Sequence, residues 1–216
     1  MLHKEAVDPG TLELLKALQE KEYLKGFCLV GGTALALQIG HRTSVDIDLF
    51  SDFEFDAGQL LENLSSDFDF RLFYSAKNTL KGSIGEIKVD ILAHRYPYVN
   101  DPVVIENILM ASTPDIIAMK LNAISTSGQR VKDFLDIYYL FRQYSLTEML
   151  GFYKTKYAAY NEVNVLKSIT WFDDIDYSGW PVLLLDPKLK WPKIAAKITQ
   201  ETQKYLKTIY DNTMDN

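Results

Sequence analysis

The sequence predicts an α+β fold, with a mixed α/β first part followed by a mostly helical second part. Short apolar runs separated by glycines, and one strict alternation of acidic and apolar residues, indicate strands among helices in the first part. After Thr113-Pro114 the apolar residues recur at helical spacing. A length of 216 residues suits one large domain or two small ones. We therefore expect an α/β core over residues 1–112 and a helical domain packed on it over residues 113–216.

The first part is expected to alternate between helices and strands. Asp8-Pro9 opens a helix whose leucines follow at roughly helical spacing. Asp46-Ile47-Asp48-Leu49 has the period-two pattern of a strand, and Gly31-Gly32 stops the apolar run before it. The expected helices are residues 9–25, 33–39 and 56–64, and the expected strands are residues 27–30, 45–50, 68–74 and 86–92, with a turn marked by Gly82 and Gly85.

The second part is expected to be helical around one long loop. Threonine followed by proline, at Thr113-Pro114, is typical of a helix start. Three Xaa-Pro pairs between residues 173 and 192 favour a loop there. The expected helices begin at residue 113, span residues 131–144, and number two or three more within 145–170 and 192–210, while the loop carries a short strand at 182–185.

Composition excludes several classes of protein. The formal net charge is −6, which argues against a strongly basic nucleic-acid coat protein. A single Cys28 and three widely spaced histidines exclude a disulfide framework and make a cysteine- or histidine-built metal site unexpected. The first ten residues lack a signal peptide's apolar segment, and no apolar run approaches the roughly 20 residues of a membrane span. We expect a cytoplasmic protein without a membrane partner.

Asp46 and Asp48 are the first candidate metal ligands. Side chains two residues apart on a strand point to the same face, where two carboxylates can hold a hard divalent ion such as Mg²⁺. Taken alone, the same pair is also typical of two solvated carboxylates on an exposed strand. The charge distribution adds weight, because residues 1–150 carry 14 basic and 21 acidic side chains.

Gly31, Gly32 and Thr33 form a candidate phosphate-binding turn. Two glycines allow close backbone approach to a ligand, and the following helix start offers free N–H groups and a positive dipole end. The Thr33 hydroxyl could donate to a phosphate oxygen. A plain strand–turn–helix corner is the alternative, since the pattern is neither a dinucleotide fingerprint nor a Walker A loop.

A third carboxylate, Asp90, stands on another expected strand among apolar neighbours. Burial of a carboxylate is costly unless it is paired or bound to metal. If its strand pairs beside that of Asp46 and Asp48, the three carboxylates converge in an arrangement suited to two-metal displacement at phosphorus. A salt bridge or a strand end would explain Asp90 equally simply.

These residues together resemble the AbiEii/AbiGii toxin family of nucleotidyltransferases, within the polymerase-β-like superfamily. The resemblance covers about residues 27–141 and implies the mixed sheet of that fold with flanking helices, followed by a C-terminal helical region. It rests on Gly31-Gly32-Thr33-Ala34-Leu35-Ala36-Leu37, Gly40-His41-Arg42-x-Ser44-x-Asp46-Ile47-Asp48-Leu49-Phe50, Lys88-Val89-Asp90, Met119-Lys120-Leu121 and Arg130-x-Lys132-Asp133-Phe134-x-Asp136-Ile137-Tyr138-x-Leu140.

The resemblance implies a role for each matching residue. Threonine stands here where the family's Gly-Ser pair has serine, which keeps the hydroxyl. The implied cofactors are two Mg²⁺ ions, with Mn²⁺ as an alternative, and the implied substrate is an NTP. The implied metal ligands and catalytic residues are Asp46, Asp48 and Asp90, and the implied nucleotide-binding residues are Gly31, Gly32, Thr33, Lys120 and Asp133.

Several of these residues also have structural explanations. Lys120 offers a point charge for phosphate, or it is a lysine whose stem packs on an apolar helix face. Asp133 and Asp136 lie on one helix face, where either could anchor Arg130 or Lys132. His41 and Arg42 could reach phosphate or pack at the loop surface, and the sequence does not decide between these.

The leading hypothesis is the toxin of a toxin–antitoxin pair, of the abortive-infection type, that modifies RNA such as tRNA and has a cognate antitoxin. A small-molecule, antibiotic-type nucleotidyltransferase is the first alternative, marked by a deep acidic acceptor pocket instead of a basic groove. A non-catalytic nucleotide-binding protein and a glycosyltransferase with an Asp-x-Asp site are the others. The retained carboxylates count against the former, and the Gly-Gly-Thr turn fits the latter poorly.

Overall fold

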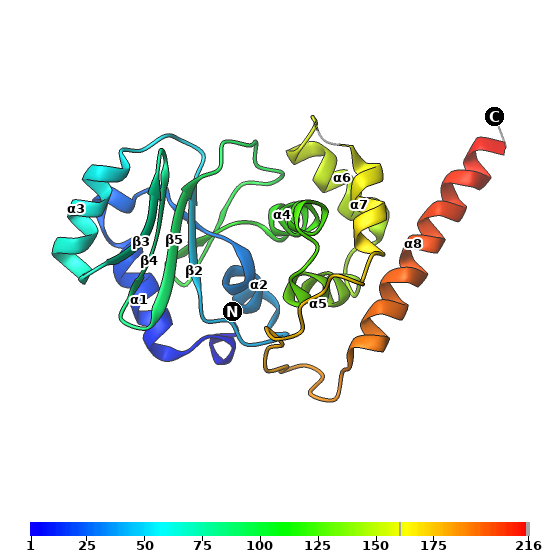
Figure 1. Cartoon of the computed structure of the whole chain (residues 1–216), viewed down its shortest axis with the longest axis horizontal. Helices are drawn as coiled ribbons and strands as arrows, with labels where there is room; N and C mark the ends of the chain where they lie inside the picture. Colours follow the sequence, from blue (N-terminus) through cyan, green and yellow to red (C-terminus); the bar gives the residue numbers. More distant parts are fainter. Residues whose placement is uncertain (160, 215–216) are drawn as a thin grey trace. The chain divides into compact units, whose positions relative to one another are not determined.

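The computed structural model describes residues 1–159 and 161–214, and its chain divides into two compact units. The first unit spans Met1–Thr113 and the second Pro114–Asn216. Each unit is described by itself below, with the elements labelled as in Figure 1. The mixed sheet and the helices confirm the expected α+β class.

The first unit is built on a seven-stranded mixed sheet. Its strand order is β3-β4-β5-β2-β1-β7-β6, with the central strand β2 paired parallel to β5 and antiparallel to β1. The pair β1–β7 is also parallel, and the other neighbours are antiparallel. The strands are β1 (Cys28–Leu29), β2 (Ile47–Ser51), β3 (Arg71–Ala76), β4 (Thr79–Ile84), β5 (Ile87–Ala93), β6 (Val103–Ile105) and β7 (Ile108–Met110).

Three α-helices accompany this sheet, and the expected caps form at their ends. Asp8 accepts a hydrogen bond from the Gly10 N–H at 2.8 Å, and Asp56 accepts one from the Gln59 N–H at 3.0 Å. Gly40 ends its helix with a left-handed φ of 63°. The helices are α1 (Pro9–Gln19), α2 (Gly31–Ile39) and α3 (Ala57–Phe68), with short 3₁₀ turns at Lys4–Ala6 and Glu22–Leu24.

Two expectations about the helices of this unit were wrong in extent. The first helix ends at Gln19 instead of near Lys25, and a separate 3₁₀ turn then buries Leu24. The helix capped by Asp56 continues to Phe68 instead of ending at Leu64, so the next strand begins only at Arg71. In both places apolar spacing alone did not mark the end of the helix.

Three strands were not expected from the sequence. Gly82 was expected to mark a turn but lies within strand β4. A glycine is needed at this position because a Cβ atom would collide with the Phe70 ring and the Arg71 backbone. The hairpin β6–β7 turns through Glu106 and Asn107, both at positive φ. Its strands are only three residues long, too short to show a period.

The second unit consists of helices connected by loops. They are α4 (Thr113–Thr126), α5 (Val131–Leu140), α6 (Leu146–Lys156), α7 (Glu162–Ile169) and α8 (Trp191–Met214). A capping box between Ser145 and Glu148 begins α6. Helix α5 ends at Leu140, four residues before the expected end. The expected strand at 182–185 is wrong: within that segment only Leu183, which is buried, forms a β-bridge, and Val182 and Leu185 are exposed in the loop.

Each unit has its own buried apolar side chains. In the first, Ile47 and Leu49 of β2 and Val89 and Ile91 of β5 are fully buried. In the second, Phe134 is fully buried and contacts a partly exposed aromatic cluster of Phe172, Tyr177 and Trp191, in which the contacting ring centroids lie 5.4–5.9 Å apart. None of the helices within the described residues is long and apolar enough to cross a membrane.

Candidate active site

Two of the three candidate carboxylates lie side by side in the sheet of the first unit. Strands β2 and β5 are parallel neighbours, and Asp48 is directly paired with Asp90. Adjacent strands lie about 4.8 Å apart, and paired residues share a face, so both carboxylates occupy one face. Asp46 immediately precedes β2. The pairing of these two strands, on which convergence of the carboxylates depended, is therefore present.

Asp90 forms ion pairs through one carboxylate oxygen, while its other oxygen has no hydrogen bond. Its side chain is 8% exposed, and its Oδ2 lies 2.9 Å from the Lys88 Nζ and 3.9 Å from the Lys81 Nζ. Its Oδ1 is buried and has no hydrogen-bond partner in the structure. The salt-bridge explanation of Asp90 is thus correct for one oxygen. The other is a buried acceptor that a cation or a hydroxyl group could satisfy.

Lys88 places a positive charge directly beside Asp90. Burial by itself lowers the pKa of Lys88, but the hydrogen bond to Asp90 and the charges of Asp90, Asp48 and Asp46 raise it above its ordinary value overall. The ammonium group therefore feels all three candidate carboxylates at once. Sequence reasoning missed Lys88, although its position two residues before Asp90 on one strand places both on the same face.

The donor set suits Mg²⁺, although no three-ligand cluster is preformed. Across residues 1–159 and 161–214, no three His, Cys, Asp or Glu side chains are grouped so as to hold a metal ion. Magnesium in phosphoryl-transfer sites is commonly held by one or two carboxylates together with substrate phosphates and water. Asp48 and Asp90, with the open Asp90 Oδ1, provide such a pair.

Replacing Lys88 by methionine is expected to raise the affinity of the nucleotide-free protein for Mg²⁺. The ammonium and a divalent cation would compete for Asp90, so removing the ammonium is expected to tighten binding several-fold, up to about 10-fold. The same change is expected to lower the melting temperature more without Mg²⁺ than with it. Calorimetric titration with Mg²⁺ and Mn²⁺ measures the first effect, with Lys77→Met as the control. Weaker metal binding by the Lys88 variant would contradict the competition.

The Gly-Gly turn brings backbone close to Asp48. The Val30 N–H donates to the Asp48 carbonyl oxygen at 2.9 Å, which joins the start of α2 to β2. Gly31 has φ +71°, and a Cβ atom there would lie 2.6 Å from the Asp48 Oδ2. A Cβ atom on Gly32 would lie 2.6 Å from the Arg42 Nη2. The positive φ therefore favours glycine at position 31, and the start of α2 lies between a carboxylate and a guanidinium.

Gly31→Ala is expected to lower both stability and activity. The left-handed backbone costs a non-glycine residue about 1–2 kcal/mol, and the methyl group would also push the Asp48 carboxylate aside. Urea unfolding measures the first effect and nucleotide transfer the second. The matched control is Gly151→Ala in α6, where a Cβ atom meets nothing within 4 Å and alanine is expected to stabilise the helix by about 0.5–1 kcal/mol. Equal behaviour of the two variants would remove the special role of Gly31.

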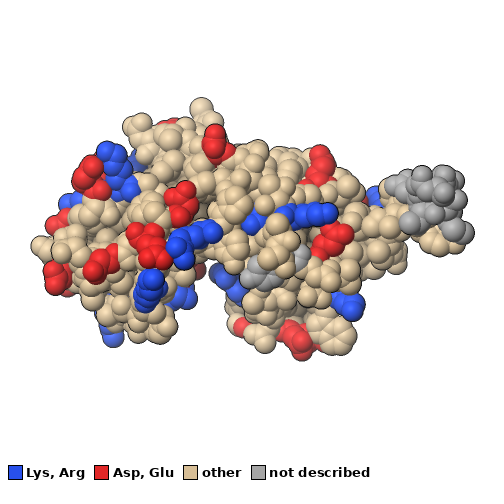
Figure 2. Space-filling model, turned by 90° about the horizontal axis from the view of Figure 1, so that it is seen from above, with Lys and Arg blue, Asp and Glu red and all other residues tan. Residues whose placement is uncertain are grey.

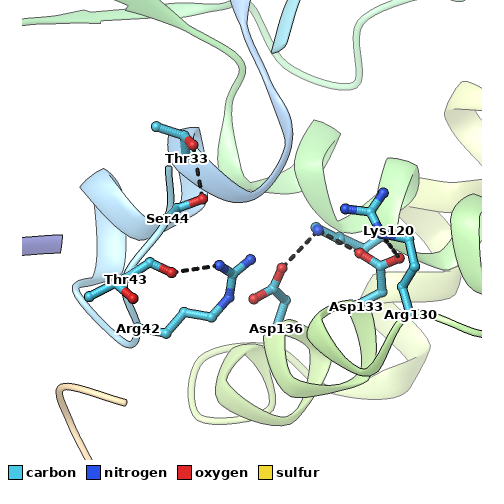
Figure 3. Close-up of polar contacts among 8 residues, drawn as sticks. All are labelled: Thr33, Arg42, Thr43, Ser44, Lys120, Arg130, Asp133 and Asp136. Carbon is cyan, nitrogen blue, oxygen red and sulfur yellow. Dashed lines mark hydrogen bonds and ion pairs between the residues drawn. The ribbon is translucent and has the colours of Figure 1, made fainter. Parts of the chain in front are cut away.

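Thr33 holds the chain that leads to the carboxylates. It is buried, and its hydroxyl lies 2.9 Å from the Ser44 hydroxyl (Figure 3). The same hydroxyl donates to the Asp46 carbonyl oxygen. Arg42 is also buried and donates from Nη1 to the Thr43 carbonyl oxygen at 2.9 Å. The structure therefore gives Thr33 a positioning contact with Asp46, while its expected contact with phosphate stays a prediction.

The second unit contains a buried charge cluster of Lys120, Asp133 and Asp136. The Lys120 Nζ on α4 lies 2.6 Å from the Asp133 Oδ1 and 2.8 Å from the Asp136 Oδ2, both on α5 (Figure 3). All three side chains are at most 7% exposed. The more exposed Arg130 adds a contact of 3.8 Å to Asp133. Lys120 and Asp133 thus join two helices, and their expected contact with a nucleotide stays a prediction.

The structure therefore groups the expected site residues in two sets. The carboxylates and the Gly-Gly-Thr turn belong to the first unit, and Lys120 and Asp133 belong to the second. Asp136, which the sequence left between alternatives, shares Lys120 with Asp133.

Comparisons with known proteins agree with this chemistry. The family described as "Nucleotidyl transferase AbiEii toxin, Type IV TA system" matches residues 13–70 and 67–212. The uncharacterized protein aq_aa25 of Aquifex aeolicus (strain VF5) is 34% identical over 154 residues, which are 68% of this chain and 74% of that protein.

Two solved structures share the fold at low sequence identity. JHP933 from Helicobacter pylori superposes with a TM-score of 0.55 at 17% identity, over 97% of each chain. MenT4, the nucleotidyltransferase toxin Rv2826c of Mycobacterium tuberculosis H37Rv, superposes with a TM-score of 0.57 at 14% identity, over 88% of this chain and 82% of its own.

Proposed function

The chain belongs to the AbiEii family of nucleotidyl transferase toxins, and from this premise we propose that it transfers a nucleoside monophosphate from a Mg²⁺-bound NTP to a hydroxyl group of RNA. Nucleotidyl transfer is the activity of the family. The need for Mg²⁺ and the RNA acceptor, with tRNA as the first candidate, are the parts that we propose. The observation that supports the need for Mg²⁺ most is the pairing of Asp48 with Asp90 across β2 and β5.

Bound Mg²⁺ would supply positive charge to the triphosphate and lower the pKa of the attacking hydroxyl. Asp48 and Asp90 would hold the ions, with Asp46 beside them. Asp90 can also accept the proton of the acceptor hydroxyl through its open Oδ1. The hydroxyl oxygen then attacks the α-phosphorus, the bond to the β-phosphate breaks, and pyrophosphate leaves.

The start of α2 would bind the triphosphate. The first N–H groups of a helix have no partners within it, and the dipole there favours an anion. Because Gly31 and Gly32 have no side chains, a phosphate can approach these N–H groups closely. Arg42 lies against Gly32 and adds a positive charge there. Thr33 keeps Asp46 near this turn through its hydrogen bond to the Asp46 carbonyl.

Family membership also suggests a partner and a location. The family description places these toxins in toxin–antitoxin systems, so we propose a cognate antitoxin. We also propose a cytoplasmic location, because NTPs and RNA are found there and the single, buried Cys28 forms no disulfide within the chain, which suits a reducing compartment.

A transfer assay tests the acceptor. The purified protein is incubated with Mg²⁺, each α-³²P-labelled NTP in turn, and total bacterial RNA, with Asp46→Ala as the control. Label in tRNA-sized material that is absent from the control supports the proposal and names the nucleotide. NTP binding without labelled RNA would contradict the RNA acceptor and favour a small-molecule acceptor. Neither labelling nor nucleotide binding would favour a non-catalytic protein.

A further inference from the structure

A cavity in the second unit is lined by positive charge. It has a volume of about 540 Å³ and lies between α5 and α8, two helices that pack against each other. Three of its six lining residues are cations and none is an acid. The lining residues are Tyr138, Arg142, Lys193, Ala196, Lys197 and Gln200.

The lysines of this cavity begin a longer row along α8. Lys193, Lys197, Lys204 and Lys207 follow at spacings of four, seven and three residues, which keep them on one side of a helix. From first to last they span about 21 Å at the helical rise of 1.5 Å per residue. Ile194 and Ile198, on another side of α8, are fully buried. We call the four lysines together with Arg142 the α8 basic face.

Nearby carboxylates neutralise this face only in part. Glu201 is shared, at 2.8 Å, by Lys197 and Lys204, and Asp186 lies 3.6 Å from Lys193. Lys193 and Lys204 are exposed, and because ion pairs of exposed lysines are weak and screened by salt, these two can exchange their carboxylates for other anions. Arg142 is held in place by stacking on the Tyr139 ring, 4.7 Å from its centroid.

We propose that the α8 basic face binds the phosphodiester backbone of the acceptor RNA, which rests on the proposed function. Its cations follow a line along the helix instead of converging on one point, so they suit a chain of phosphates better than a single anion.

The local character of this face explains how an acidic protein can hold RNA. The chain carries a net charge of −6, yet residues 151–216 have nine basic and eight acidic side chains. Acidic and basic side chains are interspersed on the surface drawn in Figure 2, without one broad basic region. RNA contact is therefore expected to depend on a few placed cations, and removing them should have a large effect.

The test is RNA binding without NTP or metal. Fluorescence anisotropy of a labelled tRNA transcript is measured for wild type, for Arg142→Gln/Lys193→Gln/Lys197→Gln, and for Arg71→Gln/Lys25→Gln/Lys154→Gln. The last is a control that removes the same charge from exposed positions elsewhere. The first triple variant is expected to bind at least about 10-fold more weakly at low salt. Its slope of log affinity against log salt is expected to be smaller by about 2, since each phosphate contact contributes about 0.7.

The outcomes separate this inference from the proposed function. Equal affinity of the two triple variants, or no RNA binding by wild type, would overturn the inference. Displacement of RNA by millimolar inorganic phosphate would also overturn it, by showing a site for a single anion. RNA binding that is lost in the first triple variant, in a protein that labels no RNA, would support the inference and count against the proposed function alone. Circular dichroism confirms that each variant is folded.

Discussion

Asp48→Ala is expected to abolish nucleotide transfer, a loss of at least about 10³-fold, while the fold stays intact. The carboxylate is paired in register with Asp90 and lies against the Gly31 backbone, so its removal takes away one side of the cation site. The fold is expected to remain because the buried face of β2 is formed by Ile47, Leu49 and Ser51. Asp46→Ala is expected to have the same result. Transfer of α-³²P label measures both.

The matched control is Asp52→Ala, an exposed aspartate directly after β2, which is expected to keep wild-type activity. Far-ultraviolet circular dichroism and the melting temperature check the fold of all three variants. Unchanged transfer by the Asp48 or the Asp46 variant would remove that residue from the metal site.

Lys120→Met is expected to destabilise the second unit by about 3–5 kcal/mol. Its ammonium is the partner of two carboxylates, Asp133 and Asp136, which are 4% and 0% exposed. Removing the ammonium takes one buried cation away from these two carboxylates, which is far more costly than losing an exposed ion pair. Urea unfolding measures the loss, and Lys154→Met, an exposed lysine of α6, is expected to change stability by less than about 0.5 kcal/mol.

A second variant separates charge compensation from packing. Lys120→Met combined with Asp133→Asn and Asp136→Asn is expected to recover part of the lost stability, because the two buried carboxylate charges are then removed together with the ammonium. If Lys120→Met unfolds like wild type, the cluster is not structural. Lys120→Ala would then be expected to weaken NTP binding, as the sequence predicts.

The parts of the site that could be predicted from sequence are those set by local chemistry. Gly31-Gly32 after an apolar run indicated a strand, a tight turn and a helix, since glycine adopts the φ of +71° at the lowest cost and leaves room for the approach to Asp48. The alternation around Asp48 indicated its strand. Gly40 indicated the end of α2, which it forms in the left-handed conformation.

The rest depends on contacts between segments far apart in the chain. Nothing local shows that Asp48 is paired with Asp90, because register is set by packing across the sheet. For the same reason the strand around Gly82 appeared as a turn, and Lys88 was not recognised as the partner of Asp90. The two carboxylate partners of Lys120 were not evident either, because they lie on α5, which follows α4 only after a loop.

The most direct test of the account is Mn²⁺ binding, measured by electron paramagnetic resonance with a non-hydrolysable NTP present. Bound Mn²⁺ is expected in wild type and in Asp52→Ala, and its loss is expected in Asp48→Ala. Bound Mn²⁺ in Asp48→Ala equal to that in wild type would contradict the assignment of the metal to the paired carboxylates of β2 and β5.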